Sequence, residues 1–140
     1  MSEGSVRDLI HHRRPVGLRG DTSVKDACAV MRAECVGAVL VTDDKGALIG
    51  IFTGRDAIAR VLAEGRDPAT TRLREVMTPD PETVSGKISA VDALRCMQDG
   101  KFRHLPVVAD GRVIGVISRG DFRLLDQGRL DIETGLWERL

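Results

Sequence analysis

Two short motifs in the sequence place a hydroxyl group and a carboxylate three residues apart. They are Thr53-Gly-Arg-Asp56 and Ser118-Arg-Gly-Asp121, and each follows a glycine and two apolar residues, Gly50-Ile-Phe52 and Gly115-Val-Ile117. A carboxylate that emerges at the end of a buried strand can accept two hydrogen bonds from a ribose cis-diol, as an acidic residue does in dinucleotide folds. The motifs therefore suit a nucleoside-binding site.

The same spacing is also a helix-capping pattern. A serine or threonine followed three residues later by an acidic residue satisfies free N–H groups at the start of a helix. Ser23-x-x-Asp26 and Ser89-x-x-Asp92 match this pattern as well, without the preceding glycine and apolar pair. The spacing alone leaves ribose binding and helix capping both open.

An internal repeat supplies the elements that must position the motifs. The motifs lie 65 residues apart, and upstream of them residues 23–27 match residues 89–93 at an offset of 66. Farther back, residues 6–10 resemble residues 73–77. We predict two tandem domains at residues 6–65 and 73–128, a linker at 66–72 and a C-terminal amphipathic helix at 129–140.

Each repeat shows the same order of predicted elements. Apolar residues at i, i+3, i+4 and i+7 after Ser23 and after Ser89 predict a first helix. Hairpin spacing and turn residues predict strand pairs at 38–42 with 48–53 and at 104–108 with 113–118. A second helix is predicted at about 55–64 and 120–127.

The composition narrows the class of protein. The 140 residues are 42% hydrophobic, enough for one compact domain or two small halves. The 21 basic and 21 acidic residues cancel, which argues against binding to nucleic acid or to an acidic membrane. No apolar run is long enough to span a membrane. Cys28, Cys35 and Cys96 lack CxxC spacing, so we predict buried, free thiols, no metal site and a cytoplasmic protein.

Together these features resemble the tandem CBS domain pair, or Bateman module, named after cystathionine beta-synthase. The resemblance covers residues 6–128, and residues 102–108 and 76–79 are similar to further family segments. It implies an α/β (α+β) fold of two β-α-β-β-α units, packed through their sheets about a pseudo-twofold axis, with ligand clefts between them.

The resemblance also implies an adenosine-containing ligand: AMP, ADP, ATP or S-adenosylmethionine. Asp56 and Asp121 would hold ribose hydroxyls, and Thr53 and Ser118 would bond near the ribose or phosphate. Apolar side chains and backbone amides would surround the adenine, namely Val16, Gly37, Ala38, Val39 and Ile51 in one site, and Thr83, Val84, Leu105 and Val116 in the other.

The two repeats differ where a phosphate would lie. Arg103 and His104 stand in the second repeat at the positions of Gly37 and Ala38 in the first. Arginine offers a planar fork of donors to phosphate. Arg55 and Arg119, inside the motifs, could also reach a phosphate, or be solvated surface residues. His104 could instead be an edge-strand histidine bonded to backbone. We expect the two sites not to be equivalent.

Three classes of function remain to be compared. We predict a stand-alone, homodimeric regulatory module that binds an adenosine ligand and modulates an unidentified partner protein. The alternative is a ligand-free dimerisation scaffold whose motifs are only helix caps. The sequence does not favour an enzyme, because it has no G-x-x-x-x-G-K-[ST] loop, nucleophile elbow or metal-spaced His/Cys cluster.

Overall fold

The computed structural model describes residues 5–10, 15–100 and 102–119. These residues form two compact units. The first unit is residues 16–81. The second unit combines residues 5–10 and Pro15 with the described residues from Glu82 onward. Each unit therefore has its own sheet and its own hydrophobic core.

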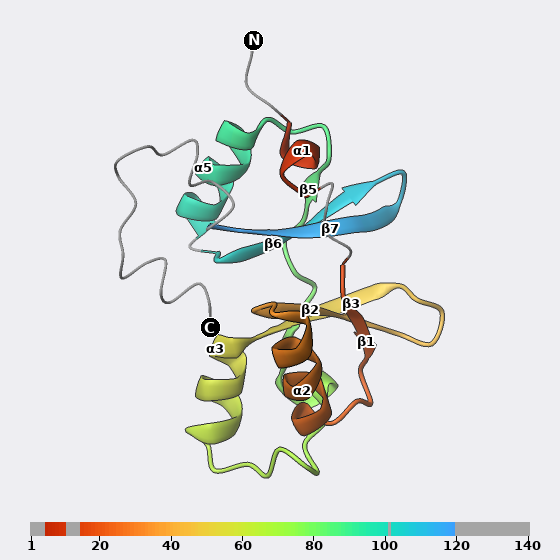
Figure 1. Cartoon of the computed structure of the whole chain (residues 1–140), viewed down its shortest axis with the longest axis vertical. Helices are drawn as coiled ribbons and strands as arrows, with labels where there is room; N and C mark the ends of the chain where they lie inside the picture. Colours follow the sequence, from red (N-terminus) through yellow and green to blue (C-terminus); the bar gives the residue numbers. More distant parts are fainter. Residues whose placement is uncertain (1–4, 11–14, 101, 120–140) are drawn as a thin grey trace. The chain divides into compact units, whose positions relative to one another are not determined.

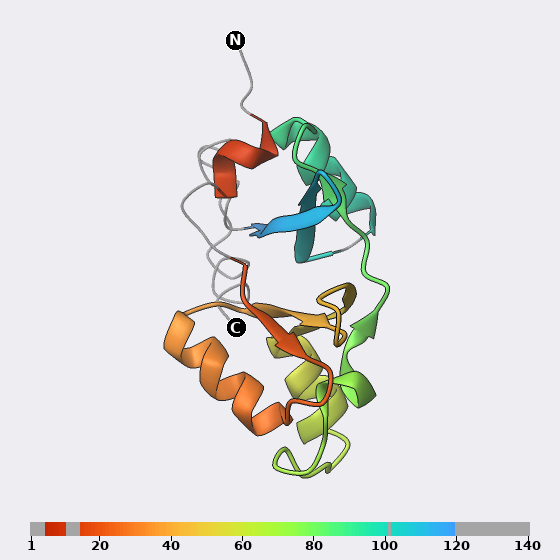
Figure 2. The same ribbon diagram turned by 90° about the vertical axis from the view of Figure 1, so that its right-hand side faces the viewer.

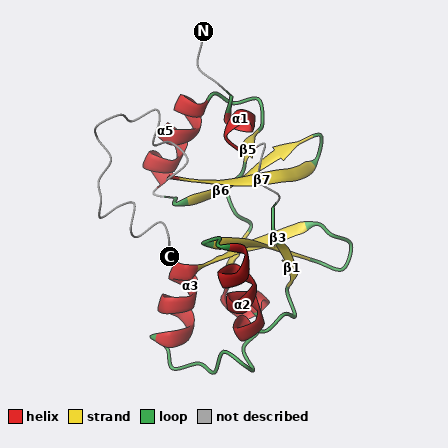
Figure 3. Ribbon diagram, viewed as in Figure 1, coloured by secondary structure: helices red, strands yellow, loops and turns green. Residues whose placement is uncertain are grey.

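The first unit is a four-stranded sheet in the order β1-β2-β3-β4. Strand β1 runs parallel to β2, and β2, β3 and β4 pair antiparallel. Helices α2 and α3 lie on the same face of this sheet (Figures 1 and 3). In chain order the elements are β1 (Gly17–Arg19), α2 (Val24–Glu34), β2 (Ala38–Thr42), β3 (Leu48–Thr53), α3 (Gly54–Asp56), the π-helical stretch η1 (Ala57–Leu62), α4 (Leu73–Val76) and β4 (Thr78–Pro79).

The second unit is a three-stranded sheet in the order β5-β6-β7, with β5 parallel to β6 and β6 antiparallel to β7. Its elements are α1 (Val6–Ile10), β5 (Val84–Ser85), α5 (Ala90–Gly100), β6 (His104–Ala109) and β7 (Arg112–Ser118). Each repeat thus gives the predicted strand, helix, strand, strand order of a mixed α/β fold. The second helix predicted for this repeat, at 120–127, and the predicted helix at 129–140 lie outside the described residues.

Local sequence signals account for most of these elements. The predicted hairpin strands are confirmed, and glycines with φ of +84° and +77°, Gly46 and Gly111, lie in the two turns. Ser23 and Ser89 cap α2 and α5 by accepting the backbone N–H of Asp26 and Asp92, at 3.1 and 3.0 Å. The helix predicted at about 55–64 is confirmed, although it is not a regular α-helix throughout. It begins at Gly54 and becomes π-helical, with the N–H of Ala63 bonded to the carbonyl of Ile58 at 2.8 Å.

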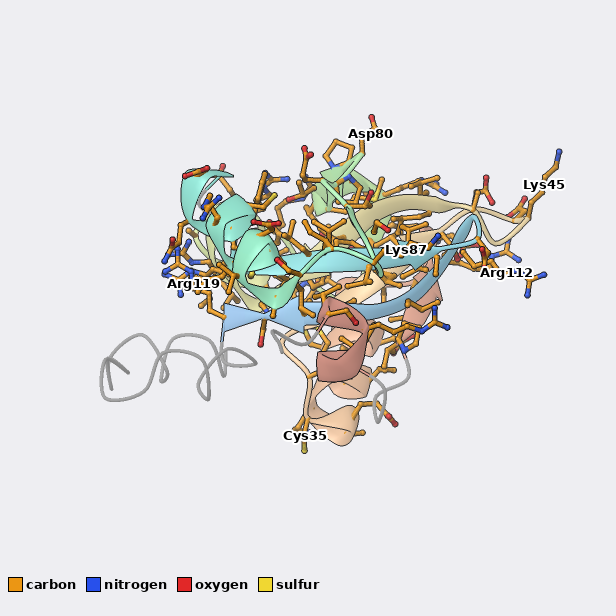
Figure 4. The ribbon with its side chains drawn as sticks, turned by 90° about the horizontal axis from the view of Figure 1, so that it is seen from above. Cys35, Lys45, Asp80, Lys87, Arg112 and Arg119 are labelled. Atoms are coloured by element: carbon orange, nitrogen blue, oxygen red, sulfur yellow. The ribbon has the colours of Figure 1, made fainter. Side chains whose placement is uncertain are left out.

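The three cysteines are free thiols, as predicted. Cys28 and Cys96 are only partly buried, and the prediction of burial is wrong for Cys35, which is exposed at the end of α2 (Figure 4). Cys35 ends that helix in the left-handed conformation, with φ of 56°, which takes it off the buried face. In the described part of the chain, no helix is long and apolar enough to cross a membrane.

Two short helices are exchanged between the repeats. Helix α1 begins the first repeat but packs on β7 of the second unit (Figure 2), and α4 begins the second repeat but packs on β3 of the first unit. The N–H of Val6 donates to the carbonyl of Ile88, and the N–H of Leu73 donates to the carbonyl of Thr22, both at 2.9 Å. These bonds are equivalent in the repeat, so each unit is completed by a segment from outside its own repeat.

The glycine that opens each motif makes room for the exchanged segment. A Cβ atom on Gly115 would lie 2.7 Å from Cδ1 of Ile10. A Cβ atom on Gly50 would overlap Sδ of Met77 and lie 3.0 Å from the carbonyl oxygen of Thr78. Gly50 matches Gly115 in the repeat, and Met77 matches Ile10. The same close contact between a strand glycine and an exchanged segment therefore occurs at equivalent positions in both repeats.

We predict that Gly115→Ala and Gly50→Ala each lower the free energy of unfolding by about 1–3 kcal/mol, because the added methyl group overpacks a buried contact. Urea denaturation followed by circular dichroism measures this. Gly17→Ala is the control, since its Cβ atom would meet nothing closer than 3.9 Å. Ile10→Ala combined with Gly115→Ala should cost less than the sum of the single changes. Equal stability of Gly115→Ala and Gly17→Ala would contradict the prediction.

Candidate functional site

The first motif forms the corner between β3 and α3. The backbone N–H of Asp56 donates to Oγ1 of Thr53 at 3.2 Å. In return, Oδ2 of Asp56 accepts the backbone N–H of Thr53 at 3.0 Å and its hydroxyl at 3.2 Å. This reciprocal arrangement is a capping box, so the capping interpretation of this motif is confirmed.

The Asp56 carboxylate is buried, with 8% of the residue exposed. Its Oδ1 atom lies 3.4 Å from Oγ1 of Thr78 and 3.6 Å from Nε of Arg60. Burial raises the pKa of Asp56, while hydrogen bonds from Thr53 and the positive charge of Arg60 oppose that rise. These groups support the ionised form of a carboxylate that has lost most of its water.

Sequence reasoning missed Thr78 and Arg60. Arg60 had a local signal, because it stands four residues after Asp56 on a predicted helix, the spacing of an ion pair. Thr78 had none, since it reaches Asp56 only through the pairing of β3 with β4, in which Ile51 lies opposite Thr78. That pairing depends on the exchange of segments between the repeats.

The two oxygens of Asp56 differ in what they can still do. Oδ2 already accepts two hydrogen bonds, at 3.0 and 3.2 Å, whereas both contacts of Oδ1 are longer, at 3.4 and 3.6 Å. An ionised carboxylate offers about four lone-pair sites. Oδ1 can therefore still accept a hydrogen bond from a hydroxyl group of a ligand.

The remaining residues predicted for the first site fall on two faces of the sheet. Ala38 pairs with Thr53, and alternation along the strands places Ala38 and Ile51 on the face away from the helices. Val39 is fully buried in the core on the helix face, so only its backbone can meet a ligand on the other face. The structure thus brings Ala38, Ile51 and Thr53 together and turns the Val39 side chain away.

Two predicted residues of the first site are held through their backbones. The carbonyl of Gly37 accepts the N–H of Gly54 at 3.1 Å, at the motif corner. The carbonyl of Val16 accepts the N–H of Leu40 at 2.8 Å, just before β1. Gly37 is therefore part of the corner. Arg55 lies on α3 with its side chain exposed.

The second repeat distributes its predicted residues in a similar way. Val84 and Leu105 belong to the core of the second unit, at 7% and 0% exposure, and can offer only backbone groups. Val116 alternates with core residue Ile117 and shares the opposite face with Ser118. Thr83 is exposed, just before β5. Asp121 lies outside the described residues.

Basic groups gather at the open end of the β6–β7 hairpin. His104 pairs with Ser118, so Arg103 and Arg119 flank that pair in the sequence of the two strands. Figure 4 labels Arg119. Nε of Arg119 is buried and has no hydrogen-bond partner among the described residues. Burial, together with the positive charge of Arg103, lowers the pKa of His104 to about 4. His104 is therefore neutral near pH 7, and the positive charge here comes from the arginines.

His104 lies at the first position of β6. Strand β6 is the middle strand of its three-stranded sheet, but its pairing with β5 covers only Val107 and Val108, so His104 itself is paired with β7 alone, at Ser118. The corresponding end of the β2–β3 hairpin carries Ala38 and Gly37 instead. The two strand-end sites thus differ in charge, although their strands have the same register.

Comparison with known proteins places these features in a family. A model of the CBS domain matches residues 6–63 and 73–127. The CBS domain-containing protein CBSCBSPB2 of Arabidopsis thaliana is 48% identical over 96 residues, which are 69% of this chain and 18% of that protein. The CBS-domain protein ATU1752 of Agrobacterium tumefaciens has a similar structure, with 34% identity, a TM-score of 0.77 and coverage of 84% of this chain and 89% of that one.

Two further solved structures contain bound groups. The CBS domain pair of MJ0100, at 24% identity and a TM-score of 0.78 over 89% of this chain and all of that one, is in complex with 5-methylthioadenosine and S-adenosyl-L-methionine. Hypoxic Response Protein I, at 27% identity and a TM-score of 0.71 over 85% of this chain and 96% of that one, holds two coordinated zinc ions. Among the described residues of this chain, no group of three His, Cys, Asp or Glu side chains could hold a metal ion.

We predict that His104 makes stability fall on mild acidification. The folded pKa, about 4, lies below the ordinary value of 6.5, so the unfolded chain takes up the proton first. The histidine contribution is fully present above pH 6.5 and is lost as the pH falls toward 4, at up to about 1.4 kcal/mol per pH unit. Urea unfolding at several pH values should show a slope that His104→Gln reduces. An imidazole resonance of His104 that titrates near pH 6.5 would contradict this prediction.

Proposed function

Because the chain belongs to the CBS domain family, with two copies of the domain, we propose that it is a non-catalytic regulatory module that binds an adenosine-containing ligand. The candidates are AMP, ADP, ATP and S-adenosylmethionine. The ligand would bind at the strand-end motifs, and its binding would modulate a partner protein. The chain would act as a homodimer, with no metal required.

The observation that supports this proposal most strongly is the hydrogen bonding of the two carboxylate oxygens of Asp56. Its Oδ2 atom is fixed by Thr53, so the carboxylate is held in one orientation at the strand end. Its Oδ1 atom has only long contacts, at 3.4 and 3.6 Å, and can accept a ribose hydroxyl. A fixed carboxylate with one acceptor to spare suits recognition of a diol. The complex of MJ0100 guides the choice of probes.

The basic end of the β6–β7 hairpin supports a ligand that carries phosphate. A buried guanidinium nitrogen without a hydrogen-bond partner is costly, and an anion would satisfy it. Arg119 has such an atom among the described residues, and Arg103 flanks the same strand end. A neutral His104 can donate one hydrogen bond there without adding charge. The second site would therefore favour AMP, ADP or ATP over adenosine.

One observation favours a second candidate function, the ligand-free dimerisation scaffold. Asp56 is buried and acts as a helix cap without any ligand. A cap of this kind needs no binding role. The two candidates differ in what a substitution at Asp56 changes, because a scaffold loses only stability, whereas a sensor also loses its response to ligand.

We predict that one of AMP, ADP, ATP and S-adenosylmethionine raises the melting temperature of the wild-type protein. A ligand present at about 100 times its Kd adds about 2.7 kcal/mol of stability. Asp56→Asn keeps an acceptor for the N–H of Thr53 but removes the charge that attracts ribose hydroxyls. It should lose the thermal shift of a ligand bound at this corner, with a cap cost of about 1 kcal/mol. Titration calorimetry confirms binding.

Asp26→Asn is the matched control. Asp26 occupies the same position in the Ser23-x-x-Asp26 pattern, but it is exposed on α2. The response to ligand should survive this change. If none of the four ligands raises the melting temperature of the wild type, Asp56→Asn or Asp26→Asn, the scaffold is favoured. Turnover of ATP by the purified protein, abolished by Asp121→Ala, would contradict a non-catalytic role.

A further inference from the structure

Both contacts of Oδ1 of Asp56 lead to the exchanged segment, residues 73–81. Thr78, whose hydroxyl lies 3.4 Å from Oδ1, belongs to β4 of that segment. Arg60, whose Nε lies 3.6 Å away, donates through Nη1 to the carbonyls of Met77 at 2.8 Å and Val76 at 3.3 Å. The carboxylate thus ties the motif corner to residues 76–78.

The exchanged segment is held firmly at one end and lightly at the other. Leu73 and Val76 are buried in the core, with 0% and 2% exposure. Beyond them, β4 has only two residues, paired with Gly50 and Ile51, and the N–H of Asp80 donates to the carbonyl of Ile49 at 3.1 Å. The hydroxyl of Thr78 therefore acts at the lightly held end, just before the chain enters the second unit at Glu82.

A ligand hydroxyl that binds Asp56 is expected to use Oδ1, because Oδ2 already accepts two hydrogen bonds from Thr53, at 3.0 and 3.2 Å. Only 11% of the Asp56 side chain is exposed, so little of the carboxylate is open without movement of a neighbour. The neighbour with the longest hydrogen bond is Thr78. A hydroxyl group from the ligand can replace the Thr78 hydroxyl with the same chemistry.

We propose that the Thr78 hydroxyl competes with a ligand hydroxyl for Oδ1 of Asp56, so that ligand binding and docking of residues 77–80 oppose each other. This inference rests on the proposed function of the corner. Thr78 is then a positioning residue whose contact sets the affinity of the site. Because coupling between two equilibria is reciprocal, the ligand must loosen the segment to the degree that the segment weakens the ligand.

The first test is titration calorimetry with AMP, ATP and S-adenosylmethionine. Thr78→Val removes the hydroxyl and keeps the volume, and it should tighten binding at this corner about fivefold, the worth of one modest hydrogen bond. Thr78→Ser keeps the hydroxyl and should bind as the wild type does. Thr42→Val is the control, because that half-buried hydroxyl bonds to the carbonyl of Leu18 at 3.5 Å, away from Asp56.

The second test needs no substitution. Hydrogen exchange on the wild-type protein should become several-fold faster at the amides of Met77 and Asp80 when the bound probe is added. These amides donate to the carbonyls of Leu73 and Ile49. The amide of Leu40, which donates to Val16 in the same unit, should not change. This readout tests the coupling even if Thr78→Val fails to fold.

The outcomes separate the two proposals. If no probe binds the wild type or any variant, the proposed function is overturned, and this inference falls with it. If a probe binds but Thr78→Val leaves its affinity unchanged or weakens it, only the competition is overturned. Slower exchange at Met77 and Asp80 on binding would also overturn it, since the ligand would then strengthen the segment.

Discussion

Each exchanged segment reaches its core only because a strand glycine lets it approach closely. Gly115 admits Ile10, and Gly50 admits Met77 with the backbone of Thr78. Without these contacts α1 and α4 could not bring Val6, Ile10, Leu73 and Val76 into the cores. The same approach brings Thr78 beside Asp56. Gly50 therefore serves both the core of the first unit and the first candidate site, whereas Gly115 serves the core of the second unit.

The Asp56 carboxylate shows how stability and binding share one group. Burial of a carboxylate is costly, so the protein surrounds it with a backbone N–H, two hydroxyls and a guanidinium. The bonds from Thr53 are local, at 3.0 and 3.2 Å, and they fix the start of the helix. The contacts to Thr78 and Arg60 are long, and they reach another segment. A cap with one firmly bonded oxygen and one weakly bonded oxygen can be structural without a ligand and still respond to one.

The sequence predicted what local patterns determine and missed what depends on distant partners. The strands at 38–42 and 48–53 were predicted to the residue, because alternation and turn residues act within a hairpin. The resemblance of residues 6–10 to residues 73–77 indicates a repeated segment but not the sheet on which it packs, so the exchange and Thr78 were missed. Val39 and Leu105 are predicted in an adenine pocket because a residue's position along a strand is easier to infer than the face of the sheet on which its side chain lies. In the structure, the alternation of side chains along the strands places both side chains in the cores.

The two hairpins have the same strand register but carry side chains of different charge at their ends. Ala38 pairs with Thr53 at the end of the first hairpin, and His104 pairs with Ser118 at the end of the second. Substituting Gly37 and Ala38 by Arg103 and His104 changes no strand, yet it adds charge at the second end. Because burial keeps His104 neutral, that charge stays on arginine across the physiological pH range. A duplicated fold can thus carry different side chains at equivalent strand ends, because the pairing of the strands does not depend on those side chains.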